Sequence, residues 1–95
     1  MPGNNLVSLH AVINGRVQGV FFRAYVSRRA IELGLKGWVR NLESGEVEVH
    51  AEGARAELER MVDYLRTGPP SALVVSVDIV WGEGTGRFSG FNIAY

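Results

Sequence analysis

The sequence contains no cysteine, which excludes a disulfide framework, a thiolate metal site and a thiol nucleophile. It also lacks an excess of charge, because 10 Lys and Arg residues balance 10 Asp and Glu residues, so the overall field favours no polyanionic partner. No apolar run is long enough for a transmembrane helix, and the first residues lack the charged and apolar segments of a secretory signal. We therefore expect a cytoplasmic, monomeric protein that binds neither nucleic acid nor membranes.

What the chain does contain is typical of one ordinary globular domain. It has 95 residues, of which 46% are hydrophobic and 21% are charged. A chain of this length and composition buries enough apolar surface to fold alone. We expect a single domain over residues 1–95, with residues 1–5 flexible.

The spacing of apolar residues predicts the secondary structure. Strands are expected where apolar and polar residues alternate, and helices where apolar residues recur every three or four positions. The predicted elements are a strand at 6–14, a helix from Phe22 capped by Gly34, strands at 36–42 and 46–52 around a turn at 43–45, a helix at 54–66, a strand at 73–81, a loose turn with glycines at 82, 84 and 86, and a short strand at 91–95. This order predicts an α+β fold, a ferredoxin-like two-layer sandwich (βαββαβ) with a mostly antiparallel sheet, two helices on one face and a short C-terminal strand.

The segment between the first strand and the first helix has the pattern of an anion-binding loop. A helix start leaves backbone N–H groups unpaired and carries a positive partial charge, and glycines let the chain wrap around an anion there. Arg23, in the first helical turn, can fold a planar set of donors over the same anion. We expect such an anion to bind the backbone of Gly15, Arg16, Val17, Gln18, Gly19 and Val20. Taken alone, the pattern is better explained by a solvated arginine and by glycines that only let the chain turn than by an anion-binding loop.

Asn41 has the same parity as Val39 in the strand predicted at 36–42, so its side chain should face the helices. Beside an anion, its carboxamide offers both an acceptor and donors to a water molecule without adding negative charge. The alternative is a buried asparagine whose hydrogen bonds are satisfied by local backbone.

Two segments of the sequence resemble signatures of the acylphosphatase family. Residues 15–23, GRVQGVFFR, match G-x-V-Q-G-V-x-F-R at each fixed position. Residues 37–47, followed by a glycine at position 53, match G-W-V-x-N-x-x-x-G-x-V. The likeness spans nearly the whole chain, although Ser44 stands where many relatives have aspartate and Ala94 where some have a basic residue.

The resemblance implies an enzyme that hydrolyses the carboxyl–phosphate bond of small-molecule acylphosphates without a metal, a cofactor or a covalent intermediate. It implies that the anion is the phosphate of the substrate, held by Arg23 and by the backbone of residues 15–20, and that Asn41 positions the attacking water. It also implies that inorganic phosphate is both product and inhibitor. The rival hypothesis is a non-catalytic anion-binding or regulatory module on the same fold. Domains related to acylphosphatases and fused to larger maturation enzymes keep that alternative open.

Two groups of residues carry weaker hypotheses on the expected open face of the sheet. His10 and His50 share that face with Glu48 and Glu52, but a zinc site needs three or four converging ligands, so a solvated face is favoured.

An aromatic residue with basic neighbours, here Trp38 with Lys36 and Arg40, can bind RNA on such a face. Acidic neighbours argue against a polyanion, namely Glu46, Glu48, Glu52 and Asp78. We interpret the pair Arg28 and Arg29 as a solvated helix face.

Overall fold

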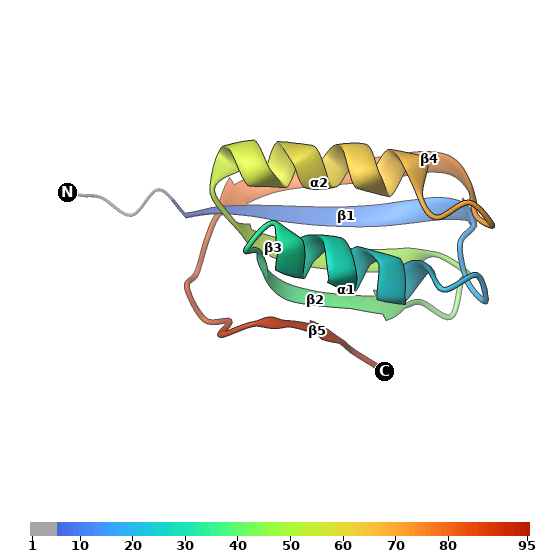
Figure 1. Cartoon of the computed structure of the whole chain (residues 1–95), viewed down its shortest axis with the longest axis horizontal. Coiled ribbons are helices and arrows are strands. Elements are labelled where there is room, and N and C mark those ends of the chain that lie inside the picture. Colours follow the sequence, from blue (N-terminus) through green and yellow to red (C-terminus); the bar gives the residue numbers. More distant parts are fainter. Residues whose placement is uncertain (1–5) are drawn as a thin grey trace.

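The structure, a computed structural model, describes residues 6–95, in which two helices pack on one face of a five-stranded sheet (Figure 1). The elements are β1 (Val7–Arg16), α1 (Phe22–Glu32), β2 (Lys36–Asn41), β3 (Val47–Gly53), α2 (Arg55–Thr67), β4 (Leu73–Glu83) and β5 (Phe91–Ile93). The strand order is β4-β1-β3-β2-β5, antiparallel except for the pair β2 and β5. The predicted ferredoxin-like sandwich is confirmed. Residues 1–5, where flexibility was expected, lie outside the described residues.

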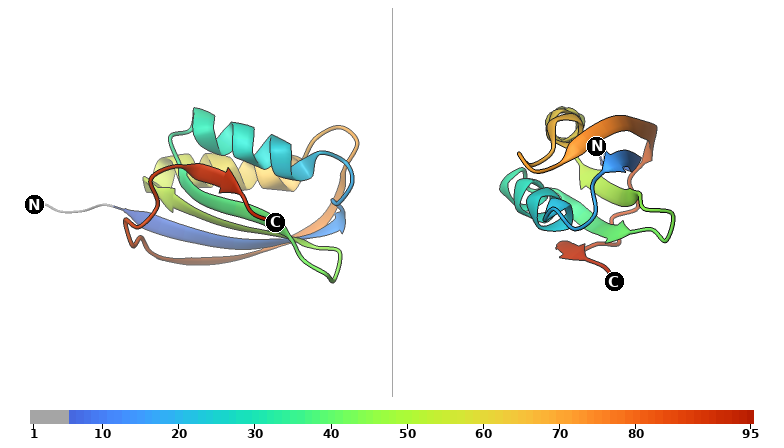
Figure 2. Two further views of the ribbon diagram at one scale, coloured as in Figure 1. Left: turned by 90° about the horizontal axis from the view of Figure 1, so that it is seen from below. Right: turned by 90° about the vertical axis from the view of Figure 1, so that its right-hand side faces the viewer.

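The core lies between the sheet and the helices, where the alternation of β1 predicted it. Leu9, Ala11 and Ile13 are fully buried. Their register partners on β3 are buried as well, namely Ala51, Val49 and Val47. Each large aliphatic side chain buried in this way contributes about 1.5–3 kcal/mol. Figure 2 shows the opposite face of the sheet without a covering helix.

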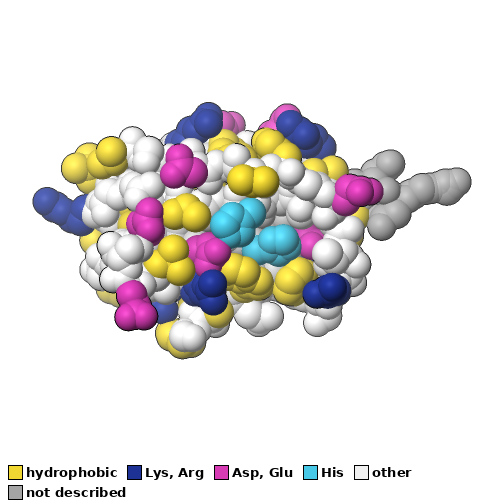
Figure 3. Space-filling view, turned by 180° about the vertical axis from the view of Figure 1, so that it is seen from behind, with side chains coloured by type: hydrophobic (Ala, Val, Ile, Leu, Met, Phe, Trp, Pro, Cys, Tyr) yellow, Lys and Arg dark blue, Asp and Glu magenta, His cyan; other side chains and the backbone are white. Residues whose placement is uncertain are grey.

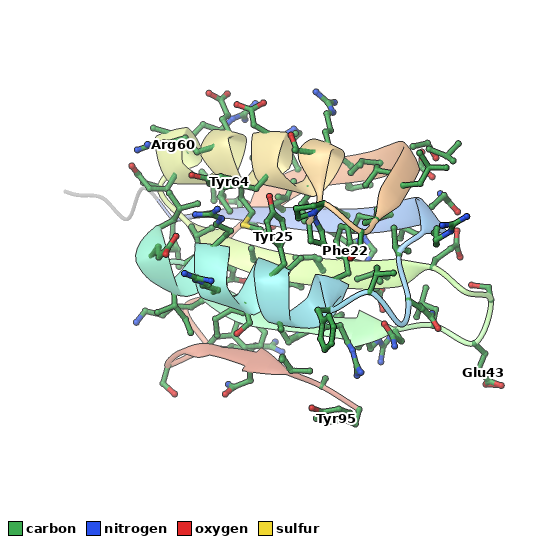
Figure 4. All side chains as sticks on the ribbon, turned by 45° about the vertical axis from the view of Figure 1, so that its right-hand side comes forward. Phe22, Tyr25, Glu43, Arg60, Tyr64 and Tyr95 are labelled. Carbon is green, nitrogen blue, oxygen red and sulfur yellow. The ribbon has the colours of Figure 1, made fainter. Side chains whose placement is uncertain are left out.

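Each helix turns an apolar stripe toward this core. α1 buries Phe22, Val26 and Ala30, which are spaced four residues apart. α2 buries a wider set at the predicted spacing, namely Leu58, Met61, Val62 and Leu65. Tyr25 and Tyr64 meet between the helices, with their ring centroids 6.4 Å apart (Figure 4).

Arg29 differs from the prediction of a solvated arginine pair. Its guanidinium lies over the rings of Tyr64 and Tyr25, 4.6 and 5.5 Å from their centroids. It also donates a hydrogen bond to Glu32 at 3.1 Å, whereas Arg28 stays largely exposed. The packing of α2 against α1 brings Tyr64 within reach of Arg29. The spacing of residues along α1 alone does not predict this contact.

The first strand is longer than predicted because a glycine inside it forms a bulge. β1 continues through Gly15 and Arg16, and its register with β4 shifts between Asn14 and Gly15. Gly15 has φ 133°, and a Cβ there would lie 2.0 Å from the carbonyl oxygen of Leu73, so only glycine fits. β4 extends to Glu83, beyond its predicted end at residue 81, because it pairs with the whole of β1.

The connections that follow β1, β2 and α2 lie together at one end of the sandwich, on the right in Figure 1. β5 ends at Ile93 rather than at the predicted residue 95, and its parallel pairing with β2 directs the C-terminal segment toward this same end. Among residues 6–95, neither helix has the length and apolar character needed to cross a membrane.

Candidate active site

Gln18 fixes the predicted loop to the β2–β3 turn. Its Nε2 donates hydrogen bonds to the backbone oxygens of Leu42 at 2.7 Å and Glu46 at 2.8 Å. Asn41 precedes Leu42 in the chain, so these bonds hold the loop beside Asn41. The sequence prediction assigned only the backbone of Gln18 and missed this role of the side chain.

Two further contacts hold the loop in place. Val17 is buried in the core, with 1% of its surface exposed. Ser71, between α2 and β4, donates a hydrogen bond from its Oγ to the backbone oxygen of Val20 at 3.3 Å. The loop is therefore attached to the core, to the β2–β3 turn and to the α2–β4 connection, so its geometry is set before a ligand binds.

The sign of the backbone angle φ alternates along residues 19–21. Gly19 with φ 74° and Phe21 with φ 61° and ψ 26° are left-handed, whereas Val20 has no positive φ. Alternating right- and left-handed residues turn successive N–H groups toward one side and form anion-binding concavities, and the positive φ of Gly19 and Phe21 is compatible with such a loop. Glycine adopts the left-handed conformation without steric cost, which explains Gly19.

The first turn of α1 adds donors and no competing carboxylate. The N-cap residue Phe21 makes no side-chain hydrogen bond, and the first turn contains no acidic residue. The unpaired N–H groups and the positive end of the helix dipole therefore face whatever lies before the helix. Arg23 stands in this turn, where a cation is disfavoured unless an anion compensates it.

Arg23 and Asn41 line one pocket with a volume of about 290 Å³. Val17, Gly19 and Phe21 contribute from the loop, and Ile93 and Tyr95 from the C-terminal segment. The guanidinium of Arg23 lies over the ring of Tyr95, 4.9 Å from its centroid. Neither the Arg23 nor the Asn41 side chain makes a hydrogen bond or an ion pair with any residue in the range 6–95.

The predicted site residues divide into two groups. Val17, Gly19, Arg23 and Asn41 meet at the pocket, and Asn41 is exposed there at the end of β2 rather than buried. The other four residues predicted to bind phosphate are absent from the lining of this pocket, namely Gly15, Arg16, Gln18 and Val20. Gly15 and Arg16 belong to β1 and pair with β4.

Phe21 and Tyr95 are lining residues that sequence reasoning missed. Phe21 occupies a variable position in the first signature, and its unusual backbone leaves no mark in the sequence. Tyr95 reaches Arg23 only because β5 pairs with β2. The adjacent Ala94 supplies no basic group. The side chain that contacts the Arg23 guanidinium here is the aromatic ring of Tyr95.

On the open face of the sheet, His10 and His50 are register partners on β1 and β3, and the two histidines lie side by side in Figure 3. His10 and Arg40 each lie 2.6 Å from a carboxylate oxygen of Glu48. Burial acts to raise the pKa of Glu48, but the hydrogen bonds from His10 and Arg40 outweigh it and hold the pKa below its ordinary value. Among residues 6–95, no group of three or more His, Cys, Asp or Glu residues is arranged to hold a metal ion.

Glu52 is a buried carboxylate, with only 2% of its surface exposed. Four hydrogen-bond donors surround it. It accepts from His50 at 2.9 Å, from the backbone N–H groups of Thr85 and Gly86 at 2.9 and 3.0 Å, and from the Thr85 hydroxyl at 3.0 Å. Burial acts to raise its pKa, but these donors outweigh burial and lower it. Glu52 thereby anchors the segment that leads to β5.

Comparison with known proteins identifies a family. The family model named Acylphosphatase matches residues 9–93. An acylphosphatase from Pelotomaculum thermopropionicum is 45% identical over 86 residues, covering 90% of this chain and 94% of its own. The crystal structure of acylphosphatase from Bacillus subtilis superposes with a TM-score of 0.91 at 32% identity, covering 94% of this chain and 99% of its own. The structure of an acylphosphatase from Coxiella burnetii gives 0.86 at 41% identity, covering 95% and 94%.

Proposed function

Because the chain belongs to the acylphosphatase family, we propose that it hydrolyses acylphosphates at the pocket that Arg23 and Asn41 share. The observation that carries the proposal is a guanidinium with no carboxylate partner in residues 6–95, placed in one pocket with the loop residues Gly19 and Phe21. An anion is the ligand that this combination of charge and donors attracts. A phosphoryl group bound there interacts with the backbone N–H groups and with the fork of Arg23.

The reaction needs little further machinery. Phosphoryl transfer proceeds through a loose transition state, so that positioning and stabilisation of charge on the equatorial oxygens supply most of the catalysis. The leaving group of an acylphosphate is a carboxylate, whose acid has a pKa of about 4, so it departs without a proton. Arg23 and the loop backbone supply the positive field, and we propose that no metal ion takes part.

Asn41 is the group that we assign to the attacking water. Its carboxamide oxygen accepts a hydrogen bond from the water, which turns an oxygen lone pair of the water toward phosphorus. The water forms the new P–O bond, the bond from phosphorus to the carboxylate oxygen breaks with its electron pair, and the products are a carboxylate, inorganic phosphate and a proton. Inorganic phosphate keeps the charge that Arg23 binds, and we therefore expect it to inhibit.

The test is turnover of benzoyl phosphate in water labelled with oxygen-18. Attack on phosphorus predicts that the label enters inorganic phosphate and not benzoate. Label in benzoate would show attack at the carbonyl carbon and contradict the proposed roles. Absence of turnover by a folded protein that still binds phosphate would favour the non-catalytic, regulatory module.

We also propose a single domain over residues 1–95 that works as a cytoplasmic monomer. The balanced charge, the absence of cysteine and the single core cluster of the described residues support this proposal. Analytical ultracentrifugation tests the monomer, and localisation of a tagged full chain tests the compartment.

A further inference from the structure

Phe21 has a backbone conformation that its side chain disfavours. It is the one residue other than glycine with positive φ in residues 6–95, at φ 61° and ψ 26°. In this conformation the Cβ lies close to the following carbonyl oxygen, which glycine avoids and asparagine tolerates. The concave loop therefore accounts for the backbone conformation but does not require a phenylalanine.

Core packing does not account for the ring either. Phe21 is 84% exposed, whereas the neighbouring Phe22 is 1% exposed and belongs to the core. A ring left in water at a strained position gains little in folding. Its presence needs an explanation other than stability.

The position of Phe21 suggests that explanation. Phe21 lines the Arg23 pocket together with Ile93 and Tyr95. Tyr95 is 99% exposed, so the pocket is bordered by two aromatic rings that both face solvent. Arg23 is the one charged side chain in the lining of this pocket, and no acidic residue contributes to it.

We propose that Phe21 and Tyr95 form a subsite for the acyl group, and that the preferred substrates are acylphosphates with apolar, above all aromatic, acyl groups. This inference rests on the proposed function. With the phosphate on Arg23 and the loop, the acyl group extends from the phosphate toward the rim of the pocket. An aromatic acyl group there buries apolar surface against the exposed rings. An acyl group with its own carboxylate finds no second cation in the lining.

The kinetic test compares benzoyl, acetyl and succinyl phosphate as substrates. Phe21→Gly keeps the left-handed backbone and removes the ring, and Phe21→Asn repeats the removal with a residue that tolerates this backbone. We expect the ratio of kcat/KM for benzoyl to that for acetyl phosphate to fall about 5- to 30-fold relative to the wild type in both variants. Phe21→Tyr should retain the ratio. Succinyl phosphate should be the poorest substrate of the wild type. Val75→Asn removes another exposed apolar side chain, outside the pocket, and should leave the ratio unchanged.

A binding arm separates this inference from the proposed function. Phenylphosphonate should bind the wild type more tightly than methylphosphonate, and Phe21→Gly should remove the difference. If no acylphosphate is hydrolysed but this difference is found, the proposed function is wrong and the aromatic subsite stands. If hydrolysis occurs but both substrates lose activity in parallel in Phe21→Gly and Phe21→Asn, the subsite is wrong and the ring only supports the loop.

Discussion

On the open face of the sheet, Glu48 lies within hydrogen-bond distance of His10 and Arg40, and Glu52 is enclosed by His50 and the backbone of residues 85–86. In the pocket at the end of the sandwich, the Arg23 and Asn41 side chains have no such partner in residues 6–95. Both regions contain polar side chains, but only on the open face do these side chains find hydrogen-bonding partners within the protein. The histidine and carboxylate residues considered for zinc are thus engaged with one another.

This difference in internal hydrogen bonding separates residues that stabilise the fold from residues that are available to bind a ligand. A carboxylate that accepts several hydrogen bonds stabilises the folded state and has little capacity left for a partner. A guanidinium in the first turn of a helix, beside a backbone cradle and without a carboxylate, is electrostatically incomplete until an anion binds. We therefore expect substitutions in the pocket to reduce activity, and substitutions on the open face to reduce stability.

Arg23→Lys should give the largest effect in the comparison. Lysine keeps the charge but loses the planar fork, so kcat/KM for benzoyl phosphate should fall on the order of 10²–10³-fold and inhibition by inorganic phosphate should weaken. The matched control is Arg40→Lys on the open face, whose activity should stay within about twofold because Arg40 contacts a carboxylate and not the pocket. Near-normal kinetics of Arg23→Lys would show that the phosphate binds elsewhere.

Asn41→Ala should separate chemistry from binding. If the amide orients the water, kcat should fall roughly 10²-fold, while the Ki of inorganic phosphate changes little because Arg23 and the loop remain. Asn41→Asp should weaken both, since its carboxylate repels the phosphoryl oxygens. Asn14→Ala is the control, because Asn14 donates to Ser76 outside the pocket.

The competing explanation for Asn41 is a structural one, in which the residue only ties the hairpin to the loop, although its side chain makes no hydrogen bond with residues 6–95. It predicts a lower melting temperature for Asn41→Ala, with activity lost in proportion to unfolding. Thermal unfolding measured beside kcat distinguishes the two.

Glu52→Gln should have a moderate effect, and on stability rather than catalysis. Loss of the charged acceptor should lower the free energy of unfolding by about 1–3 kcal/mol, which corresponds to a melting temperature lower by roughly 5–20 °C. The kcat per folded molecule should change far less than in the Arg23 or Asn41 variants. A drop in kcat as large as theirs, at unchanged stability, would place Glu52 in the active site.

The same carboxylate predicts a dependence of stability on pH. Because the folded pKa of Glu52 is lowered from 4.5, its contribution is fully present above that pH and is lost as the pH falls toward the folded pKa. Urea unfolding at pH values from 7 to 3 should therefore show a smaller loss of stability for Glu52→Gln than for the wild type. Equal losses for the two proteins would mean that Glu52 is not held in its charged form.

Chelation should have the smallest effect. Arg23 and the backbone donors already provide a positive field, so the benzoyl phosphate activity after dialysis should be the same with and without excess EDTA. A loss of most activity that a divalent ion restores would contradict the metal-free mechanism.

The sequence predicts the architecture well because its signals are local. The alternation of apolar and polar residues predicted a strand at 6–14, and β1 lies there with the side chains of Leu9, Ala11 and Ile13 fully buried. The predicted end of β1 was wrong because Gly15 was interpreted as part of a loop. In the structure β1 pairs with β4 beyond Asn14, and Gly15 forms a bulge within the strand. The sequence does not distinguish a glycine in a loop from a glycine in a bulge, because the difference depends on pairing with the neighbouring strand.

The candidate site could be predicted in part. Arg23 and Asn41 were identified from the two signatures, and the structure places both on one pocket, while their roles stay predictions. The hydrogen bonds of the Gln18 side chain and the contact of Tyr95 with Arg23 depend on segments distant in sequence. The left-handed backbone of Phe21 falls on a position that varies in the signature. No local pattern carries that information.

The most direct test of the contrast between the two regions is a titration of the ¹⁵N-labelled full chain with inorganic phosphate, at constant ionic strength. Saturable shifts are expected in the amide signals of Gly19, Val20 and Phe21 and in the Nε–H signal of Arg23. The signals of His10 and His50 should stay unchanged, and Arg23→Ala should abolish the loop shifts while Asn41→Ala retains them. Saturable shifts centred on the two histidines, or none at the loop, would contradict the assignment of the pocket as the anion site.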